Sequence, residues 1–121
     1  MRCLIVDDSS VFRRTVRALL EPDGLAVTVA STSGEAQDLI EEVDPDVVLV
    51  DINLGDENGF DLVTQLAGRT RRGGGALPTI LISSHRFEDF EELIADSPAR
   101  GFLTKSMLSA AAIRSIMADD E

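Results

Sequence analysis

The chain has 121 residues, which is the size of one domain and too short for two. Its 11 Lys and Arg against 22 Asp and Glu give a formal net charge of -11, which repels a phosphate backbone and argues against direct nucleic-acid binding. No apolar run approaches the roughly 20 residues of a membrane span. We therefore expect a cytoplasmic protein without membrane insertion.

Five short apolar runs have the length and composition of β-strands. They span residues 3–6, 25–30, 47–50, 79–82 and 101–104. Cys3, the single cysteine, begins the first run and is expected in the core. Most of the runs are apolar throughout rather than alternating. Both faces of each strand are therefore expected to be covered, as in a parallel sheet between layers of helices.

Between the strands, apolar residues recur at the spacing of amphipathic helices. The predicted helices run from the Ser9–Ser10 pair to Leu20, from Thr32 to Asp44, over about 59–69, around 87–94 and around 108–117. Ser9 or Ser10 can cap the first helix, and residues 32–35 form a capping-box pattern at the start of the second. Residues 69–75, rich in arginine and glycine, are expected to form a mobile loop.

The alternation of strands and helices predicts an α/β fold, a doubly wound sandwich of three layers around a five-stranded parallel sheet. In such folds the functional site lies at the carboxyl ends of the strands, where the winding reverses. The polar residues at those ends are Asp7, Asp8, Asp51, Ser83 and Lys105. We expect these three carboxylates, one hydroxyl and one ammonium to meet in one crevice.

Three carboxylates at neighbouring strand ends repel one another unless protons or a cation neutralise them. Oxygen ligands without a nearby histidine or cysteine favour Mg2+. A carboxylate in such a site can attack phosphorus and form an aspartyl phosphate, with the metal, the lysine and the hydroxyl sharing the charge on the phosphoryl oxygens. Taken singly, the aspartates could be helix caps or turn residues and Lys105 a solvated lysine. Their coincidence at one edge favours phosphoryl transfer.

Four motifs together resemble the receiver domain of two-component response regulators, and they cover essentially the whole chain. They are residues 4–9 (LIVDDS), 47–54 (VVLVDINL) with Asn58-Gly59 downstream, 82–84 (ISS) and 101–105 (GFLTK). The resemblance implies a flavodoxin-like (βα)5 fold with strand order 2-1-3-4-5. It also implies one domain, residues 1–121, of the single-domain type that is similar to the chemotaxis response regulator.

The resemblance further implies a phosphorelay role. Asp51 would accept a phosphoryl group from a phosphohistidine of a histidine kinase or histidine phosphotransfer protein. The cofactor would be Mg2+, with Asp8 as a direct ligand, Asp7 as a ligand through water, and Asp51 and the main-chain carbonyl of Asn53 completing the protein ligands. Such a domain is no enzyme beyond catalysing its own Mg2+-dependent phosphorylation and dephosphorylation.

By the same resemblance, Ser83 and Lys105 would each bind a phosphoryl oxygen. Phe102 stands where the family carries the aromatic residue that swings inward as the hydroxyl moves toward the phosphate, so Ser83 and Phe102 form the expected switch. Asn53 and His85 border the path of the hydrolytic water and are expected to tune the phosphate lifetime. The alternatives are a plain core phenylalanine and a histidine that only begins an exposed helix.

The sequence departs from the family pattern near the site, at Ser106, at Gly55 and at Ser84, which is slightly larger than the usual alanine or glycine. Ser106 follows Lys105 where the family usually has a proline joined by a cis peptide, and a cis bond without proline costs about 2.5–4 kcal/mol. Either isomer of the Lys105–Ser106 bond is therefore open. Gly55 replaces another common proline and is expected to loosen the loop after Asp51.

We expect no output domain after the fifth predicted helix. The signal is then expected to reach a downstream protein target through the fourth helix, fifth strand and fifth helix. The fourth helix is acidic and the fifth has Arg114 as its only base, which favours a monomer or weak dimer over a charge-paired dimer. A receiver excised from a larger regulator would look the same. The face formed by Arg13, Arg14 and Arg17 either steers an acidic partner or is solvated.

Two other functions share parts of this pattern. A haloacid-dehalogenase-like hydrolase with an aspartyl-phosphate intermediate needs a general acid where Asn53 stands, and a cap for which the chain is too short. A flavodoxin-like electron carrier needs a Ser/Thr-rich phosphate loop and aromatic residues against the flavin. The first strand instead ends in Asp7–Asp8, and the chain has no Trp or Tyr.

Overall fold

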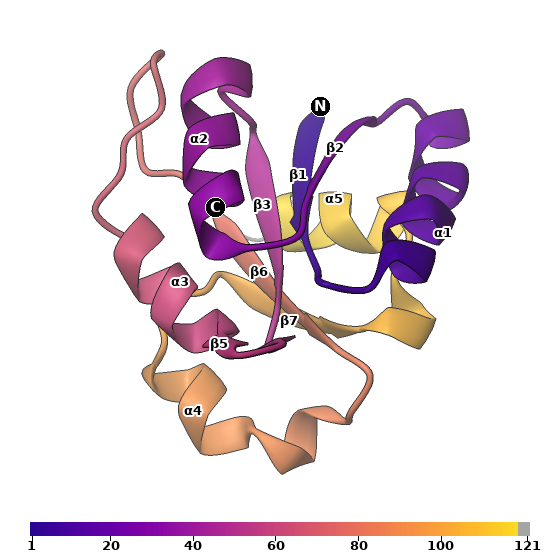
Figure 1. Cartoon of the computed structure of the whole chain (residues 1–121), viewed down its shortest axis with the longest axis vertical. Coiled ribbons are helices and arrows are strands. Elements are labelled where there is room, and N and C mark those ends of the chain that lie inside the picture. The colour runs from indigo at the N-terminus through magenta and orange to yellow at the C-terminus, as the bar shows by residue number, and fades with distance from the viewer. Residues whose placement is uncertain (119–121) are drawn as a thin grey trace.

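The computed structural model describes residues 1–118, so residues 119–121 of the expected domain lie outside it. Five parallel strands form the main sheet: β1 (Arg2–Val6), β2 (Ala26–Ala30), β3 (Val47–Asp51), β6 (Thr79–Ser83) and β7 (Gly101–Thr104). Their order, β2-β1-β3-β6-β7, confirms the predicted order 2-1-3-4-5 (Figure 1). The sheet therefore has the flavodoxin-like winding that the sequence predicts.

Helices cover both faces of the sheet. They are α1 (Ser10–Leu20), α2 (Ser33–Val43), α3 (Gly59–Leu66), α4 (Glu91–Asp96) and α5 (Ala110–Ala118). The helices α1 and α5 lie on one face and α2 and α3 on the other, with α4 beyond α3 near the carboxyl ends of the strands (Figure 1). The third helix ends at Leu66, earlier than predicted, and the fourth is preceded by a 3-10 turn over Phe87–Asp89. Among residues 1–118, no helix has the length and apolar character needed to cross a bilayer.

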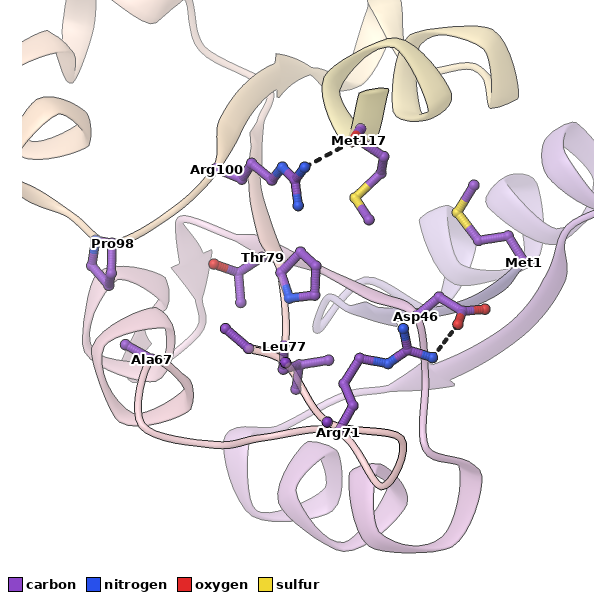
Figure 2. A pocket seen from close by; sticks show the side chains of 13 residues that line it. Met1, Asp46, Ala67, Arg71, Leu77, Thr79, Pro98, Arg100 and Met117 are labelled. Atoms are coloured by element: carbon purple, nitrogen blue, oxygen red, sulfur yellow. Dashed lines mark hydrogen bonds and ion pairs between the residues drawn. The ribbon is translucent and has the colours of Figure 1, made fainter. Parts of the chain in front are cut away.

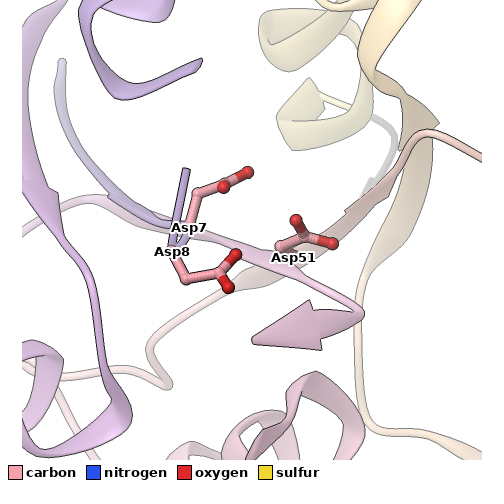
Figure 3. A group of neighbouring side chains, drawn as sticks. All are labelled: Asp7, Asp8 and Asp51. Atoms are coloured by element: carbon pink, nitrogen blue, oxygen red, sulfur yellow. The ribbon is translucent and has the colours of Figure 1, made fainter. Parts of the chain in front are cut away.

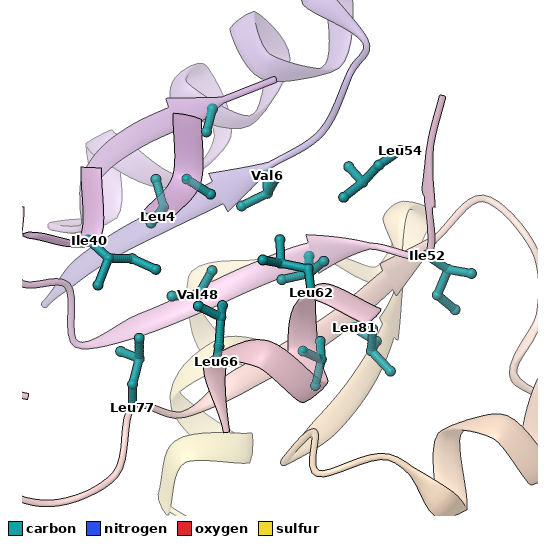
Figure 4. Packing of buried hydrophobic residues seen from close by; sticks show 14 residues of the cluster. Leu4, Val6, Ile40, Val48, Ile52, Leu54, Leu62, Leu66, Leu77 and Leu81 are labelled. Atoms are coloured by element: carbon teal, nitrogen blue, oxygen red, sulfur yellow. The ribbon is translucent and has the colours of Figure 1, made fainter. Parts of the chain in front are cut away.

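The strand β1 shows how the sheet divides the core into two halves. Leu4 and Val6 belong to the cluster under α2 and α3 (Figure 4), whereas Cys3 and Ile5 belong to the cluster under α1 and α5. All four side chains are buried, as the continuous apolar run predicts. Burial raises the pKa of the Cys3 thiol to about 12, so this thiol is a protonated, inert core group at neutral pH.

The caps of α1 and α2 follow the predicted polar residues. Ser9 rather than Ser10 is the N-cap of α1, because its Oγ accepts the Phe12 N–H at 3.2 Å. Thr32 Oγ1 accepts the Glu35 N–H at 3.1 Å, whereas the Glu35 carboxylate accepts the N–H of Ser31 rather than that of Thr32, which a capping box would use. The Ser9 and Thr32 bonds each satisfy a main-chain donor that the first turn of the helix leaves unpaired.

The arginine-rich segment predicted as a mobile loop is attached to the end of α2. Arg69 pairs with Glu41, Arg71 pairs with Asp46, and Arg72 donates to the main-chain oxygen of Glu41. An antiparallel bridge between Thr70 and Ala76 closes the loop. Cations at the carboxyl end of a helix stabilise it, because unpaired carbonyl groups give that end a partial negative charge.

A hollow of about 700 Å³ lies at the amino-terminal edge of the sheet, opposite the predicted site (Figure 2). Its wall includes Leu77 and Thr79, the Arg71–Asp46 ion pair, and Arg100, which donates to a main-chain oxygen of α5. None of the predicted site residues lines it. This hollow is thus separate from the acidic crevice.

Asp46 in this wall offers a test of how ion pairing supports the fold. Its carboxylate accepts the Arg2 N–H at 2.6 Å and pairs with Arg71. Burial acts to raise the pKa of Asp46, but the Arg2 hydrogen bond and the nearby positive charges outweigh it, so the pKa lies below 3.8. An aspartate with a lowered pKa stabilises the fold above its unfolded value and loses that contribution as the pH falls through the folded pKa.

We expect Asp46→Asn to lower the free energy of unfolding by about 1–2 kcal/mol near neutral pH. The difference from the native chain should shrink as the pH falls below the ordinary aspartate pKa and vanish only below the lower pKa of the folded state, where the native carboxylate is protonated. Urea unfolding over a series of pH values measures this, with the exposed Asp38→Asn as the matched control. A deficit that stays constant at every pH would contradict an ionic origin.

Candidate functional site

The sheet brings the predicted carboxylates to one edge through its register. Val6 pairs with Val50 across β1 and β3, so the next residues, Asp7 and Asp51, lie at the same level. Asp8 follows Asp7, and oxygens of the three carboxylates lie within 4.8 Å of one another. Figure 3 shows the three side chains turned toward a common space at the end of the strands. The predicted acidic crevice is therefore present.

Lys105 enters this crevice from the end of β7. Its Nζ lies 2.6 Å from Asp7 Oδ2 and 2.9 Å from Asp51 Oδ2. The Asp7 and Asp51 side chains are 0% and 9% exposed and that of Lys105 is 17% exposed, so this bridge is largely removed from water. A buried carboxylate without a positively charged partner would destabilise the fold, and Lys105 is that partner for both Asp7 and Asp51.

The pKa values of Asp51 and Lys105 are both raised, but for different reasons. Burial, followed by the nearby negative charge of Asp7, raises the pKa of Asp51 despite its bonds to Lys105 and to the Asn53 N–H. Burial acts to lower the pKa of Lys105, but its hydrogen bonds to Asp51 and Asp7 outweigh it and the pKa is raised. Lys105 therefore stays charged at neutral pH, and a further cation would favour the charged form of Asp51.

Main-chain groups hold the second oxygen of each buried carboxylate. Asp7 Oδ1 accepts the Ser9 N–H at 2.8 Å, and Asp51 Oδ1 accepts the Asn53 N–H at 3.0 Å. The Asp7 carbonyl in turn accepts Arg13 Nη1 at 2.7 Å. Each carboxylate is therefore held on one side by the main chain and on the other by Lys105, which orients it before any ligand arrives.

Asp8 and Gly55 leave space for a cation beside the buried pair. Asp8 is exposed, and a Cβ at position 55 would lie 3.1 Å from Asp8 Oδ2. Glycine at this position keeps the approach to Asp8 open, and its φ of +65° also favours glycine. Three carboxylates with hard oxygen donors fit a divalent cation such as Mg2+.

A short hairpin after Asp51 was not predicted. It pairs β4 (Asn53–Leu54) with β5 (Glu57–Asn58), with Gly55 in the turn. Leu54 is buried in the core, and the Glu57 carboxylate accepts the Ser33 N–H at 3.0 Å at the start of α2. The expectation that Gly55 loosens this loop stays a prediction. A two-residue Gly-Asp turn between Leu54 and Glu57 was the available signal.

Comparison with known proteins assigns this arrangement to a family. The sequence model described as the response regulator receiver domain matches residues 3–117. The chain belongs to the response regulator receiver family. Receiver domains act in two-component phosphorelay signalling, where they interact with histidine kinases and downstream effector domains. They are generally not enzymes in their own right.

Relatives share this receiver domain as part of longer chains. The sensory/regulatory protein RpfC of Xanthomonas campestris pv. campestris (strain 8004) is 30% identical over 110 residues, which are 91% of this chain and 15% of RpfC. A protein-glutamate methylesterase/protein-glutamine glutaminase of Symbiobacterium thermophilum is 35% identical over 97 residues, 78% of this chain and 25% of that protein. The chain thus spans a quarter or less of the length of these curated relatives.

Solved structures share the fold. The receiver domain (CheY-like) of Methylobacillus flagellatus matches with a TM-score of 0.81 at 23% identity, covering 100% of this chain and 98% of that chain. A response regulator receiver protein of Burkholderia phymatum matches with a TM-score of 0.77 at 28% identity, covering 97% and 92% of the two chains.

The remaining predicted residues of the receiver lie on β6, on β7 and just after β6. Ser83 is buried at the end of β6, and its Oγ accepts the His85 N–H at 2.9 Å. The exposed His85 ring meets the edge of Phe90, with ring centroids 6.0 Å apart. Phe102 in β7 is partly buried and contacts Phe87, with centroids 5.9 Å apart. The Phe102 side chain is therefore not fully buried in the core, and its ring packs against a second ring.

The Lys105–Ser106 bond of this receiver is trans, since residues 1–118 contain no cis peptide bond. Lys105 begins a 3-10 turn, Lys105–Met107, and still reaches both Asp7 and Asp51. The departure from proline thus leaves the lysine in the crevice.

Two of the three arginines on α1 have structural partners. Arg13 holds the Asp7 carbonyl, and Arg17 donates to the Val27 carbonyl at 2.8 Å and pairs with Glu21 at 3.3 Å. These contacts link α1 to β1 and β2. Neither the steering nor the solvated interpretation of this basic face anticipated them.

Proposed function

We propose that this receiver domain, residues 1–121, accepts a phosphoryl group on Asp51 from a phosphohistidine of a histidine kinase or histidine phosphotransfer protein. The observation that carries the proposal is the arrangement of Asp51 itself. It ends β3 beside Asp7 and Asp8, with one oxygen held by the Asn53 N–H and the other by Lys105. An oriented carboxylate beside a fixed ammonium is suited to attack on phosphorus.

In the proposed transfer, an oxygen of Asp51 attacks phosphorus while the P–N bond of the phosphohistidine breaks. The bonding pair leaves on the imidazole nitrogen. Lys105, charged at neutral pH, moves from the Asp51 carboxylate to a phosphoryl oxygen. Ser83 can contribute at the same time, because a hydroxyl that accepts the His85 N–H still has a proton to donate.

Mg2+ is the cofactor that we propose for this site. Asp7, Asp8 and Asp51, with the main-chain carbonyl of Asn53, would hold it. When bound, the ion neutralises charge on the phosphoryl oxygens. The three clustered carboxylates and the open space at Gly55 support this assignment.

We propose that the aspartyl phosphate shifts Ser83 and Phe102 and so changes binding of a downstream protein target at α4, β7 and α5. Phe102 contacts Phe87 on the segment before α4, which supports a connection between β7 and that surface. Asn53 and His85 would tune the phosphate lifetime. We propose a monomer or weak dimer, since Arg114, the only base predicted on the fifth helix, is used in a bond to the Asp23 carbonyl at 2.9 Å.

Phosphorylation with a small donor tests the proposal. We expect the native chain to gain one phosphoryl-sized mass increment with phosphoramidate and Mg2+, and to lose it with EDTA or in Asp51→Asn. Intact-mass spectrometry measures the increment, and Asp61→Asn, which replaces an exposed aspartate, serves as the control. An increment that persists in Asp51→Asn would exclude Asp51 as the acceptor and sink the proposal.

A further inference from the structure

An aromatic ring completes the surroundings of Lys105. Phe12 lies in the first turn of α1, and Lys105 Nζ is 4.3 Å from the centre of its ring. The ammonium therefore has carboxylates at two sides, Asp7 and Asp51, and the face of a ring at a third. A cation within about 6 Å of a ring centre is attracted by the negative charge of the ring face.

We propose that Phe12 is a positioning residue for phosphoryl transfer, holding the ammonium of Lys105 in the crevice by a cation–π contact. The inference rests on the proposed role of Lys105 and adds a residue that no motif of the chain indicates. Lysine has a long, flexible stem and no planar group to fix its direction. The ring supplies that direction.

A ring suits this role better than a third carboxylate would. Lys105 has to leave Asp51 Oδ2, at 2.9 Å, and move to an incoming phosphoryl oxygen. The ring face attracts the ammonium without a directed hydrogen bond that must break first. It also covers one side of the ammonium of a lysine side chain that is only 17% exposed, which limits competition from water. Phe12 thus holds the cation in place and still permits the shift.

The same turn of α1 aligns the ring with the acidic site. Ser9 Oγ accepts the Phe12 N–H at 3.2 Å, while the Ser9 N–H binds Asp7 Oδ1 at 2.8 Å. Arg13, the residue after Phe12, holds the Asp7 carbonyl. Ser9 and Arg13 therefore fix Asp7 and the base of the ring together, so that Lys105 reaches a preformed pocket.

The test replaces the Phe12 ring and measures phosphorylation by a small donor. No protein partner is present in the assay, because Phe12 lies on a helix whose surface could also contact a partner. We expect Phe12→Leu to slow phosphorylation of Asp51 by phosphoramidate about tenfold, the factor that corresponds to a cation–π contact of intermediate strength, between an exposed and a fully desolvated one. We expect Phe12→Trp to restore the rate, since indole binds cations best. Leu19→Ala, at a half-exposed apolar position on the same helix, should leave the rate unchanged.

Packing and charge effects are separated by a second variant. Pentafluorophenylalanine at position 12 keeps the shape of the ring but removes the negative charge of its face, and we expect it to be as slow as Phe12→Leu. Upfield ring-current shifts of the Lys105 ε-methylene resonances, measured by NMR, report the contact itself. They should be present in the native chain and absent in Phe12→Leu.

Native shifts at random-coil values, or a pentafluorinated protein as fast as the native chain, would overturn the positioning role. Failure of the proposed function has a different signature, because the native chain would then gain no Asp51-dependent mass increment while the Lys105 shifts would still report the ring contact. A Phe12→Leu variant that fails to fold would leave the pentafluorinated and Trp variants to decide.

Discussion

Lys105→Met is expected to lower the free energy of unfolding by about 3 kcal/mol near neutral pH in EDTA. The reason is the double ion pair of Lys105, at 2.6 Å from Asp7 and 2.9 Å from Asp51. Methionine fills a similar volume but leaves two buried carboxylates without a positive partner. Removal of one partner from a buried pair leaves an uncompensated charge, and that loss exceeds the small value of a surface ion pair. Urea unfolding measures the effect.

A second substitution and added Mg2+ should each restore part of the stability that Lys105→Met loses. Asp51→Asn in the Lys105→Met background removes one of the stranded carboxylates, so we expect the double variant to be more stable than Lys105→Met alone, a coupling that a double-mutant cycle measures. Mg2+ at 100 times its dissociation constant should add about 2.7 kcal/mol by mass action. A Lys105→Met chain as stable in EDTA as the native chain would show that the bridge contributes little.

Gly59→Ala is expected to lower the free energy of unfolding by about 3 kcal/mol or more and to slow phosphorylation of Asp51 about 100-fold. A Cβ at position 59 would lie 2.1 Å from the Asp51 carbonyl oxygen and 2.9 Å from the Ile52 Cα. Both neighbours are main-chain atoms, which cannot rotate away as the end of a side chain would. The start of α3 must therefore move away from β3, and Asp51 moves with it.

Gly34 offers the matched control, because a Cβ there meets nothing within 4 Å. Gly34 lies inside α2, so Gly34→Ala should leave the stability unchanged or raise it by up to about 1 kcal/mol. Urea unfolding and intact-mass time courses on both variants measure the two effects. A native phosphorylation rate in Gly59→Ala would mean that the end of β3 tolerates displacement, contrary to the tight contact.

Short-range patterns were enough to predict the strands and the charged residues that meet at their carboxyl ends. Apolar runs as short as residues 3–6 and 47–50 predict buried parallel strands because a side chain on either face of such a strand meets a helix. Once the winding is known, polar residues directly after the strands, such as Asp7 and Asp51, must meet at one edge. Local sequence was therefore sufficient to predict that Asp7 and Asp51 lie together.

Contacts between distant segments were beyond such patterns. The arginine loop on α2 and the ring of Phe12 beside Lys105 depend on how elements cross, and crossing angles and rotamers leave no periodic trace in a sequence. The ion pairs of the arginine loop were missed because glycine and arginine content does not tell which side chains will find partners.

The sequence by itself determined the order of strands and helices, the acidic edge and the family, because all three follow from residue types at fixed spacing along the chain. Only the tertiary structure decided which oxygen of Asp51 meets Lys105, which serine caps α1, and that Phe12 lies beside the ammonium. These depend on distances of a few ångströms between side chains from separate elements. Such distances are set by packing of the whole core rather than by any local run of residues.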